Sequence, residues 1–307
     1  MFEATGVFGK IRHFLAQICG QIAKFQVFGY DKIQSFRIWC MARIGILVVA
    51  YNAEATLQKV LRRIPAEVYS KIEEVFVFDD ASSDRTYETG RSLMNEPGGQ
   101  KLSIFRNPVN LMYGGNQRKG YQYAIARNLD IVVLLHGDGQ YAPEVMQELL
   151  TPLENGTADM VMGSRMMVRG AALRGNMPMY KYVGNKILTW TENTLAGLKL
   201  SEFHSGYRAY SVHALRQIPL DQMTWNWHFD TQIILEFLRK GFRIKEVPIP
   251  TYYGDEICHV NGIPYALNCI RETFKYAVRE RWRRPAASSA GRDEPDAALS
   301  LAPRPQE

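Results

Sequence analysis

The sequence predicts an α/β domain in which helices flank a mostly parallel, Rossmann-like sheet. From residue 44 onward, short apolar runs rich in β-branched residues alternate with helix-like segments. This order is typical of parallel strands joined by right-handed crossovers. Polar clusters follow several of the apolar runs, and ligands of such sheets bind beyond the carboxyl ends of the strands. The sequence therefore predicts both the fold class and the edge of the sheet that should carry a site.

The individual elements follow from local patterns in the same order. The residues Ser82-Ser83-Asp84 favour a helix start, because their side chains cap exposed backbone N–H groups. The last helix is predicted to be amphipathic, because its apolar residues form one stripe. Members of that stripe are Ile263, Leu267, Ile270, Phe274, Val278 and Trp282. The predicted strands are 44–50, 75–78, 102–105, 131–135, 159–163, 207–210 and 243–247, and the predicted helices are 54–63, 84–94, 115–126, 181–195, 231–239 and 263–284.

The two ends of the chain differ from this pattern. Apolar residues recur at helical spacing between Val7 and Phe25, which favours an amphipathic helix at a membrane surface. An equally weighted alternative is that translation starts at Met41, directly before the first strand. Residues 285–307 are rich in Pro, Ala, Ser and charge, so we expect them to be disordered. The predicted organisation is an extension over 1–43, one domain over 44–284 and a disordered tail.

The charge of the chain is unevenly distributed. The formal net charge is +6, and basic residues exceed acidic ones in 1–43 and 271–284, whereas 44–270 is electrically neutral. This distribution argues against a nucleic-acid-binding face spread over the domain and favours local contact with an anionic surface. No uninterrupted apolar stretch reaches the roughly 18 residues that a membrane-spanning helix needs, and the start lacks the order of a signal peptide. We therefore expect a cytoplasmic protein at the inner face of a membrane.

The four cysteines form no CxxC pair and no zinc-ligand spacing. They are Cys19, Cys40, Cys258 and Cys269. The sequence alone therefore predicts reduced, partly buried thiols.

The segment 136–140, His-Gly-Asp-Gly-Gln, is the most informative motif. Asp138 follows a buried strand between two glycines, where a carboxylate is held rigidly. Mg²⁺ and Mn²⁺ prefer oxygen ligands and take one or two carboxylates together with phosphate oxygens. We therefore predict that Asp138 holds Mg²⁺ or Mn²⁺ and that Gln140 adds a carbonyl oxygen. The alternative is that Asp138 only caps the helix that begins near Pro143.

Other polar residues stand at predicted strand ends. Asp79 and Asp80 follow the second strand and suit hydrogen bonds from a base N–H and ribose hydroxyls. Tyr51, after the first strand, offers a ring for stacking on a base. Arg165, after Gly163-Ser164, is placed to grip a phosphate bidentately. Arg208, inside a predicted strand, is equally suited to phosphate binding and to a structural ion pair.

The joint pattern resembles the family 2 glycosyltransferases. The residues that carry it are Ala50-Tyr51-Asn52, Asp79-Asp80-Ala81-Ser82-Ser83-Asp84-Arg85-Thr86, His136-Gly137-Asp138-Gly139-Gln140, Gly163-Ser164-Arg165 and His204-Ser205-Gly206-Tyr207-Arg208. They are most similar to the branch of dolichyl-phosphate mannosyltransferases and polyprenyl-phosphate glycosyltransferases. The resemblance covers about 44–274.

That resemblance implies a GT-A fold, a nucleotide-sugar donor, a divalent cation and inversion at the transferred sugar. By it, Tyr51, Asn52, Asp79 and Asp80 hold the nucleoside, Asp138 and Gln140 hold the metal, and Arg165 meets the diphosphate. One departure concerns the metal. His136 stands where the family has the first carboxylate of its Asp-x-Asp motif, so an imidazole, which adds no negative charge when neutral, takes that place as a candidate ligand.

The acceptor determines whether a general base is needed. A polyprenyl phosphate is ionised near neutral pH and needs none, whereas a saccharide or glycolipid hydroxyl must lose a proton to a positioned carboxylate. Asp230 is the candidate base, with an N-cap role as the equal alternative. The basic and aromatic residues of 274–284 favour peripheral contact with an anionic membrane, and hence a polyprenyl phosphate acceptor. Rival hypotheses are a nucleotidyltransferase and a non-catalytic membrane-surface or partner-binding protein.

Overall fold

The computed structural model describes residues 42–251 and 261–283. The predicted N-terminal helix and disordered tail lie outside the described residues, as do Cys19, Cys40 and Cys258. Of the four cysteines, Cys269 is described, and it is a buried free thiol.

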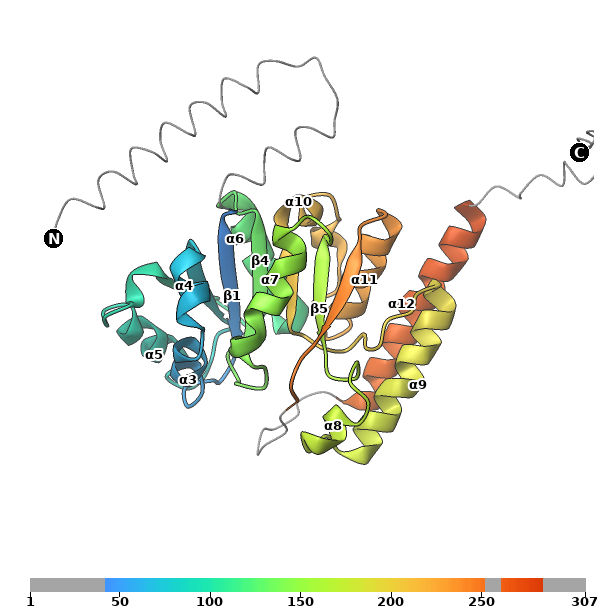
Figure 1. The fold of residues 1–307 in the computed structure, drawn as a ribbon, viewed down its shortest axis with the longest axis horizontal. Helices are drawn as coiled ribbons and strands as arrows, with labels where there is room; N and C mark the ends of the chain where they lie inside the picture. Colours follow the sequence, from blue (N-terminus) through green and yellow to red (C-terminus); the bar gives the residue numbers. More distant parts are fainter. Residues whose placement is uncertain (1–41, 252–260, 284–307) are drawn as a thin grey trace, which may run out of the picture. The chain divides into compact units, whose positions relative to one another are not determined.

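A seven-stranded sheet forms the centre of the described part, in the order β3-β2-β1-β4-β6-β5-β7 (Figure 1). Strand β6 runs antiparallel to both of its neighbours, and the other pairs are parallel. The strands are β1 Ile44–Ala50, β2 Glu74–Asp79, β3 Leu102–Arg106, β4 Ile131–His136, β5 Met160–Ser164, β6 Arg208–Ser211 and β7 Ile244–Pro248. The mostly parallel α/β sheet predicted from the sequence is confirmed.

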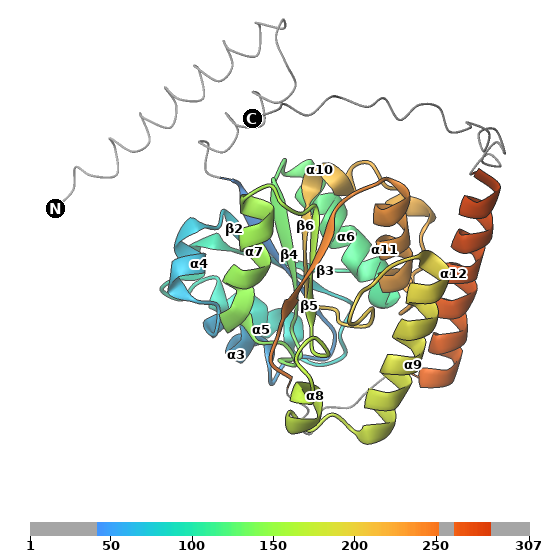
Figure 2. The same cartoon turned by 45° about the vertical axis from the view of Figure 1, so that its right-hand side comes forward.

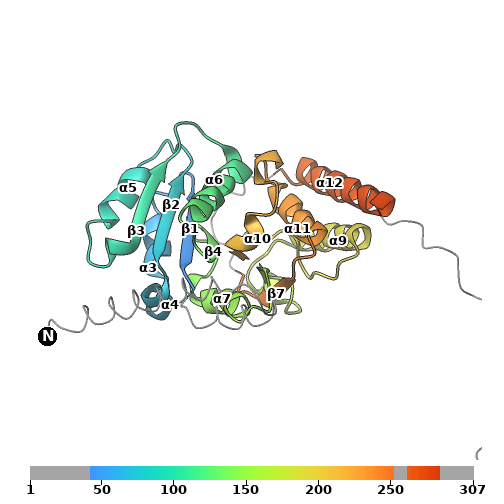
Figure 3. The ribbon, with the colours of Figure 1, turned by 90° about the horizontal axis from the view of Figure 1, so that it is seen from above.

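The helices cover both faces of this sheet. α6 lies on one face and α7 on the other (Figure 3). A Cβ atom at Gly120 of α6 would overlap the side chain of Leu47, so glycine lets this helix pack closely on β1. The helices are α3 Leu57–Arg62, α4 Ala66–Lys71, α5 Thr86–Leu93, α6 Met112–Ala126, α7 Met146–Glu154, α8 Ala171–Arg174, α9 Met179–Ala196, α10 Val212–Leu215, α11 Phe229–Arg239 and α12 Gly262–Arg283, with 3-10 turns at Gly99–Lys101, Pro143–Val145 and Leu220–Gln222.

Local sequence accounts for several of these boundaries. Asp84 accepts a hydrogen bond from the N–H of Thr86, the first residue of α5, at 3.0 Å. This bond supports the predicted helix start, because the first N–H groups of a helix have no partner within it. Helix α9 ends at Gly197, which has a φ of 71°, the left-handed conformation that glycine adopts without strain.

The antiparallel strand β6 brings a second segment to the carboxyl edge of the sheet. Arg208 at its start pairs with Leu134 near the carboxyl end of β4, and Ser211 at its end pairs with Ile131. Residues 202–207, which precede β6, therefore lie beside the polar residues that follow β4. The strand itself was predicted from the sequence, but its direction was not.

Helices α9 and α12 pack side by side (Figures 1 and 2). Cys269 and Thr273 of α12 are buried, whereas the apolar stripe predicted for this helix is exposed at Ile263, Leu267, Phe274 and Val278. Exposed apolar residues of α9 include Tyr180, Val183, Ile187 and Trp190. Among the described residues, no helix combines the length and apolar character required to span a bilayer.

Candidate active site

The polar segments that follow β1 and β4 meet where the strand order reverses. β1 pairs with β2 on one side and with β4 on the other. In doubly wound sheets, ligands bind outside the carboxyl ends of the strands at such a reversal. Tyr51 and Asn52 follow β1, and 136–140 ends and follows β4, so both segments flank this point.

Asn52 joins the end of β1 to the loop after β2. Its φ of 50° lies in the left-handed region, which asparagine tolerates. The N–H of Asn52 donates to Ser82 Oγ at 2.9 Å, and Asn52 Oδ1 accepts from the N–H of Ser83 at 3.0 Å. Beside this junction Tyr51 is 50% exposed. The Tyr51 ring is therefore accessible for stacking, and Asn52 holds the loop that carries it.

Asp79 and Asp80 are buried and bound by protein groups. Asp79 accepts a hydrogen bond from Ser82 Oγ and lies 3.5 Å from Arg106 Nε. Asp80 Oδ1 accepts from the N–H of Leu111 at 2.8 Å. Burial raises the pKa of both carboxyls. Their contact with a nucleoside stays a prediction.

The turn after β4 holds Asp138 within reach of a ligand. Asp138 Oδ1 accepts from the N–H of Gln140 at 3.0 Å, and Gly139 has a φ of 85°. This is the side-chain-to-backbone turn that aspartate favours. The Asp138 side chain is 44% exposed. The alternative role as a helix cap is not supported, because Ala142 is the N-cap of the next helical turn.

His136 lies beside Asp138, with its Nδ1 atom 3.9 Å from Asp138 Oδ2. Burial lowers the pKa of His136, which favours the neutral imidazole that ligates metals. His136 Nε2 is buried and makes no hydrogen bond among the described residues. A metal–oxygen bond of about 2.1 Å for Mg²⁺ allows two ligand atoms of one ion to lie up to about 4.2 Å apart. His136 and Asp138 therefore fit one divalent cation, with Gln140 adjacent.

Arg165 follows β5 and is held by the buried carboxylate of Glu202. Glu202 accepts from the N–H of Arg165 at 2.8 Å and from Arg165 Nε at 3.0 Å, and Arg165 Nη2 donates to the carbonyl of His204 at 3.2 Å. Burial opposes ionisation of Glu202, but the Arg165 guanidinium outweighs it and holds the pKa of Glu202 below its ordinary value. The Arg165 side chain is 12% exposed. Its position is thus set by the protein before any ligand binds.

Arg208 has a structural position. It is fully buried and donates to the carbonyl oxygens of Phe203 and Ser205, each at 2.7 Å, and of Asp230 at 2.9 Å. Two roles were predicted for Arg208, and this geometry does not support the one in which it contacts the donor directly. Arg208 instead fixes the segment that precedes β6.

Asp230 points inward from the first turn of α11. Its Oδ2 accepts from the hydroxyl of Tyr113 at 2.7 Å and lies 3.6 Å from Arg208 Nη2. Its Oδ1 is buried without a hydrogen-bond partner in the described part of the chain. The N-cap of α11 is His228, so the alternative of Asp230 as a cap is not supported.

Tyr113 and Trp227 also line this region, although the sequence analysis did not select them. Their rings stack with centroids 4.5 Å apart, and the Tyr113 ring meets the edge of His136 at 5.7 Å. The local signal was the Gly114-Gly115 pair that follows Tyr113. A Cβ atom at Gly114 would lie 2.6 Å from the carbonyl oxygen of Thr224, so the glycine permits the close approach that positions Tyr113.

Comparison with known proteins agrees with this arrangement. Residues 45–218 match the sequence profile of Glycosyl transferase family 2. The chain belongs to this family. The match covers the motifs at β1, β2, β4, β5 and β6, and the resemblance predicted from them is confirmed.

Two characterised relatives of this family 2 glycosyltransferase act on lipid phosphates according to their names. The UDP-N-acetylglucosamine–dolichyl-phosphate N-acetylglucosaminyltransferase of Methanococcus voltae is 27% identical, and the match covers 69% of this chain and 86% of the relative. The undecaprenyl-phosphate mannosyltransferase of Micrococcus luteus is 29% identical, with 67% and 82% covered.

A solved structure of similar fold is glucosyl-3-phosphoglycerate synthase from Mycobacterium tuberculosis with Mn²⁺, UDP-glucose and phosphoglyceric acid. It superposes with a TM-score of 0.60 at 17% identity, over 83% of this chain and 86% of the synthase. This similarity confirms the predicted GT-A fold.

Proposed function

We propose that this glycosyltransferase moves one sugar from a nucleoside-diphosphate sugar to a polyprenyl phosphate, with inversion, at the cytoplasmic face of a membrane. The observation that carries the proposal is the exposed carboxylate of Asp138 beside His136, at the reversal of the strand order. A leaving nucleoside diphosphate gains negative charge as the glycosidic bond breaks, and this point of the sheet is where such a ligand is held.

Several of the predicted residues have a task in this reaction. Tyr51 stacks on the base, while Asn52 fixes the loop that carries Tyr51. Asp138, with His136 and Gln140, would hold Mg²⁺ or Mn²⁺, and a bound ion stabilises the charge that develops on the diphosphate. Arg165, fixed by Glu202, adds a second positive charge on the β5 side of the site.

The exposed Tyr51 ring gives a direct test of donor binding. Replacing Tyr51 with alanine is expected to raise the Kd for the nucleoside diphosphate about 5- to 150-fold, because stacking on an aromatic ring contributes about 1–3 kcal/mol per base. Tyr51→Phe keeps the ring and should bind within about twofold of the wild type by this reasoning. Isothermal titration calorimetry with UDP and GDP measures both variants. Equal affinities for the alanine variant and the wild type would remove Tyr51 from the site.

A phosphate acceptor would need no general base. The second pKa of a phosphate monoester is about 6, so the attacking oxygen is ionised at neutral pH without a general base. The names of the Methanococcus and Micrococcus relatives, and of a polyprenol monophosphomannose synthase of Mycolicibacterium smegmatis, support an acceptor of this class.

The exposed apolar side chains of α9 and α12 support contact with the membrane that holds such an acceptor. Ile187 and Trp190 of α9 are exposed one turn apart, and α12 carries Ile263 and Leu267 in the same way. Exposed apolar surface of this kind marks an interaction site, and Trp favours the membrane interface. The basic residues predicted to assist include Arg279, which is exposed, while the side chains of 281–284 lie outside the described part.

A second candidate is transfer to a saccharide or glycolipid hydroxyl, as in the synthesis of cell-surface polysaccharide. The observation that favours it is Asp230 Oδ1, a buried carboxylate oxygen without a hydrogen-bond partner in the described residues. A carboxylate that keeps one oxygen unbonded can accept a proton from an attacking hydroxyl.

A single assay separates the two acceptors. The protein is incubated with membranes, Mn²⁺ and a panel of labelled UDP- and GDP-sugars. We expect label in an organic-extractable product that mild acid releases, which is the behaviour of a sugar linked to a polyprenyl phosphate. Label confined to a water-soluble saccharide would favour the hydroxyl acceptor and defeat the proposal.

Co-sedimentation with lipid vesicles tests the membrane contact. Replacing both Ile187 and Trp190 with alanine is expected to weaken vesicle binding about 10²- to 10⁴-fold, because burial of each large apolar side chain contributes about 1.5–3 kcal/mol. Met94→Ala removes an exposed apolar residue at the end of α5 instead and is the matched control. Unchanged co-sedimentation of the double variant with vesicles would argue against α9 as the contact.

A further inference from the structure

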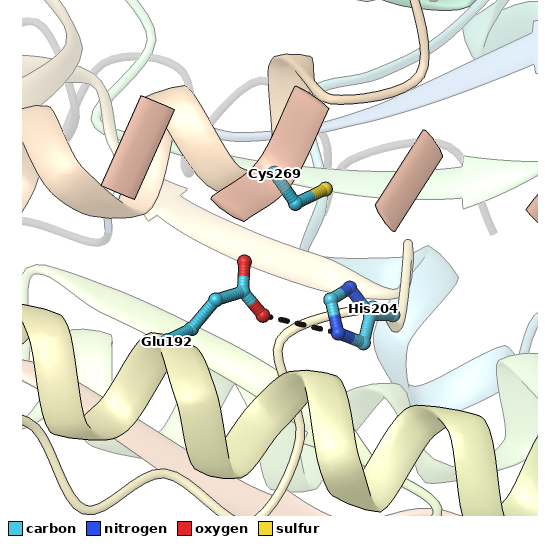
Figure 4. Close-up of side chains that lie close together, drawn as sticks. All are labelled: Glu192, His204 and Cys269. Carbon is cyan, nitrogen blue, oxygen red and sulfur yellow. Dashed lines mark ion pairs between the residues drawn. The ribbon is translucent and has the colours of Figure 1, made fainter. Parts of the chain in front are cut away.

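Three side chains with metal-binding atoms meet where α9, α12 and the segment before β6 come together (Figure 4). They are Glu192 of α9, His204 of the segment before β6, and Cys269 of α12. One ligand atom from each lies within 4.8 Å of the other two. Glu192 and Cys269 are fully buried, and the His204 side chain is nearly so. This cluster is separate from the residues 136–140 that the proposed reaction uses.

Two polar atoms of this cluster make no hydrogen bond in the described chain. They are Glu192 Oε2 and His204 Nε2, which lie 3.1 Å apart. Buried polar atoms are nearly always hydrogen-bonded, and an unpaired one costs about 1–3 kcal/mol. In the described chain the two atoms face each other as an ion pair that forms when the imidazole is protonated (Figure 4), and a metal ion bound by both would satisfy them with the imidazole neutral.

The remaining polar atoms of both side chains are held by other residues. Thr231 Oγ1 donates to Glu192 Oε1 at 3.0 Å, and His204 Nδ1 lies 2.9 Å from the hydroxyl of Tyr265. Metal-ligating histidines usually donate their second ring N–H to a fixed group, which orients the ring and leaves the other nitrogen for the metal. Thr231 and Tyr265 therefore occupy the positions of such orienting groups.

We infer that Glu192, His204 and Cys269 bind a zinc ion. A set of one sulfur, one nitrogen and one oxygen suits zinc, whereas Mg²⁺ and Mn²⁺ prefer oxygen ligands alone. Zinc takes four ligands, so a water molecule would complete the shell. The thiol binds as thiolate, and its proton leaves to solvent as the ion enters.

The ion would join three parts of the chain that are distant in sequence. It would tie α12 to α9, and both helices to the segment before β6. The carbonyl of His204 accepts from Arg165 Nη2, and Glu202, two residues earlier, accepts from Nε of the same guanidinium. By holding His204, the zinc would thus help to fix the position of Arg165. Only this last consequence for transfer depends on the proposed function.

Metal analysis of the full chain, purified without chelators or metal-affinity resin, tests the site. We expect about one zinc per chain by mass spectrometry, as a single site requires. Replacement by Co²⁺ is expected to give a thiolate charge-transfer band in the near ultraviolet. Cys269→Ser should lose this band and the stoichiometric zinc, and His204→Gln should lose the zinc. Asp138→Asn, which alters the other candidate metal site, should keep both.

Two results would overturn the inference. One is wild-type protein that contains no zinc and whose melting temperature rises with added Zn²⁺ no more than that of Cys269→Ser. The other, which does not require the variants to fold, is a wild-type Co²⁺ spectrum without a thiolate band. If zinc and the cobalt band are present but transfer is absent, the zinc site stands and the proposed function fails.

Discussion

Replacing Asp138 with asparagine is expected to lower sugar transfer about 10²- to 10³-fold, the loss typical of removing one group that stabilises developing charge. The carboxylate carries the negative charge that a divalent cation needs, and asparagine removes this charge at nearly constant shape. Asparagine Oδ1 can still accept from the N–H of Gln140, so the turn and the fold should persist. Initial rates with a labelled donor, at several Mn²⁺ concentrations, measure the effect.

Glu144→Gln is the matched control for this substitution. Glu144 lies close to the same turn, but its carboxylate pairs with Arg63 on the surface and has no predicted contact with the donor. We expect it to retain transfer within about twofold, because exposed ion pairs contribute about 1 kcal/mol or less. Wild-type rates for Asp138→Asn with divalent ions chelated would contradict the metal site and the mechanism built on it.

Much of the fold was predictable because each strand has a local signature. The run Ile44–Ala50 is continuous and apolar, and the predicted and observed bounds of β1 agree. The other strands begin or end one residue away from prediction, and β2 and β4 are longer than predicted because the polar residues Glu74 and His136 also pair in the sheet. The direction of β6 was not predictable, because it depends on residues 197–207 returning the chain to the carboxyl edge after α9 rather than on any local pattern.

The site was predictable as a location but not as a set of contacts. Strand ends identified where Asp79, Asp138 and Arg165 would lie, since parallel strands bring these ends to one edge. Which of these groups are already bonded to protein depends on pairs far apart in sequence, such as Arg165 with Glu202. The same limit applies to Cys269, whose neighbours Glu192 and His204 are too distant in sequence to form a spacing motif.

Glu202→Gln is expected to cause a large loss of stability, about 3–5 kcal/mol, together with a loss of transfer. Removing one partner of a buried ion pair leaves the other charge uncompensated. Here that charge is the Arg165 guanidinium, which then loses both its counterion and its fixed position. Denaturant unfolding at pH 7 measures the stability, and the labelled-donor assay measures the transfer.

The pH dependence separates this ion pair from a general packing defect. Because the pKa of Glu202 is held below its ordinary value of 4.5 in the folded protein, its contribution to stability is present above pH 4.5 and is lost as the pH falls through the folded value. Glu202→Gln should therefore differ from the wild type at pH 7 and approach it at low pH. Glu246→Gln is the control, because burial raises the pKa of Glu246 above its ordinary value of 4.5. The contribution of Glu246 to stability is therefore present below pH 4.5 and is lost as the pH rises through the raised value. A difference between Glu202→Gln and the wild type that stays constant across this range would show that the Arg165–Glu202 charge pair does not hold the site together.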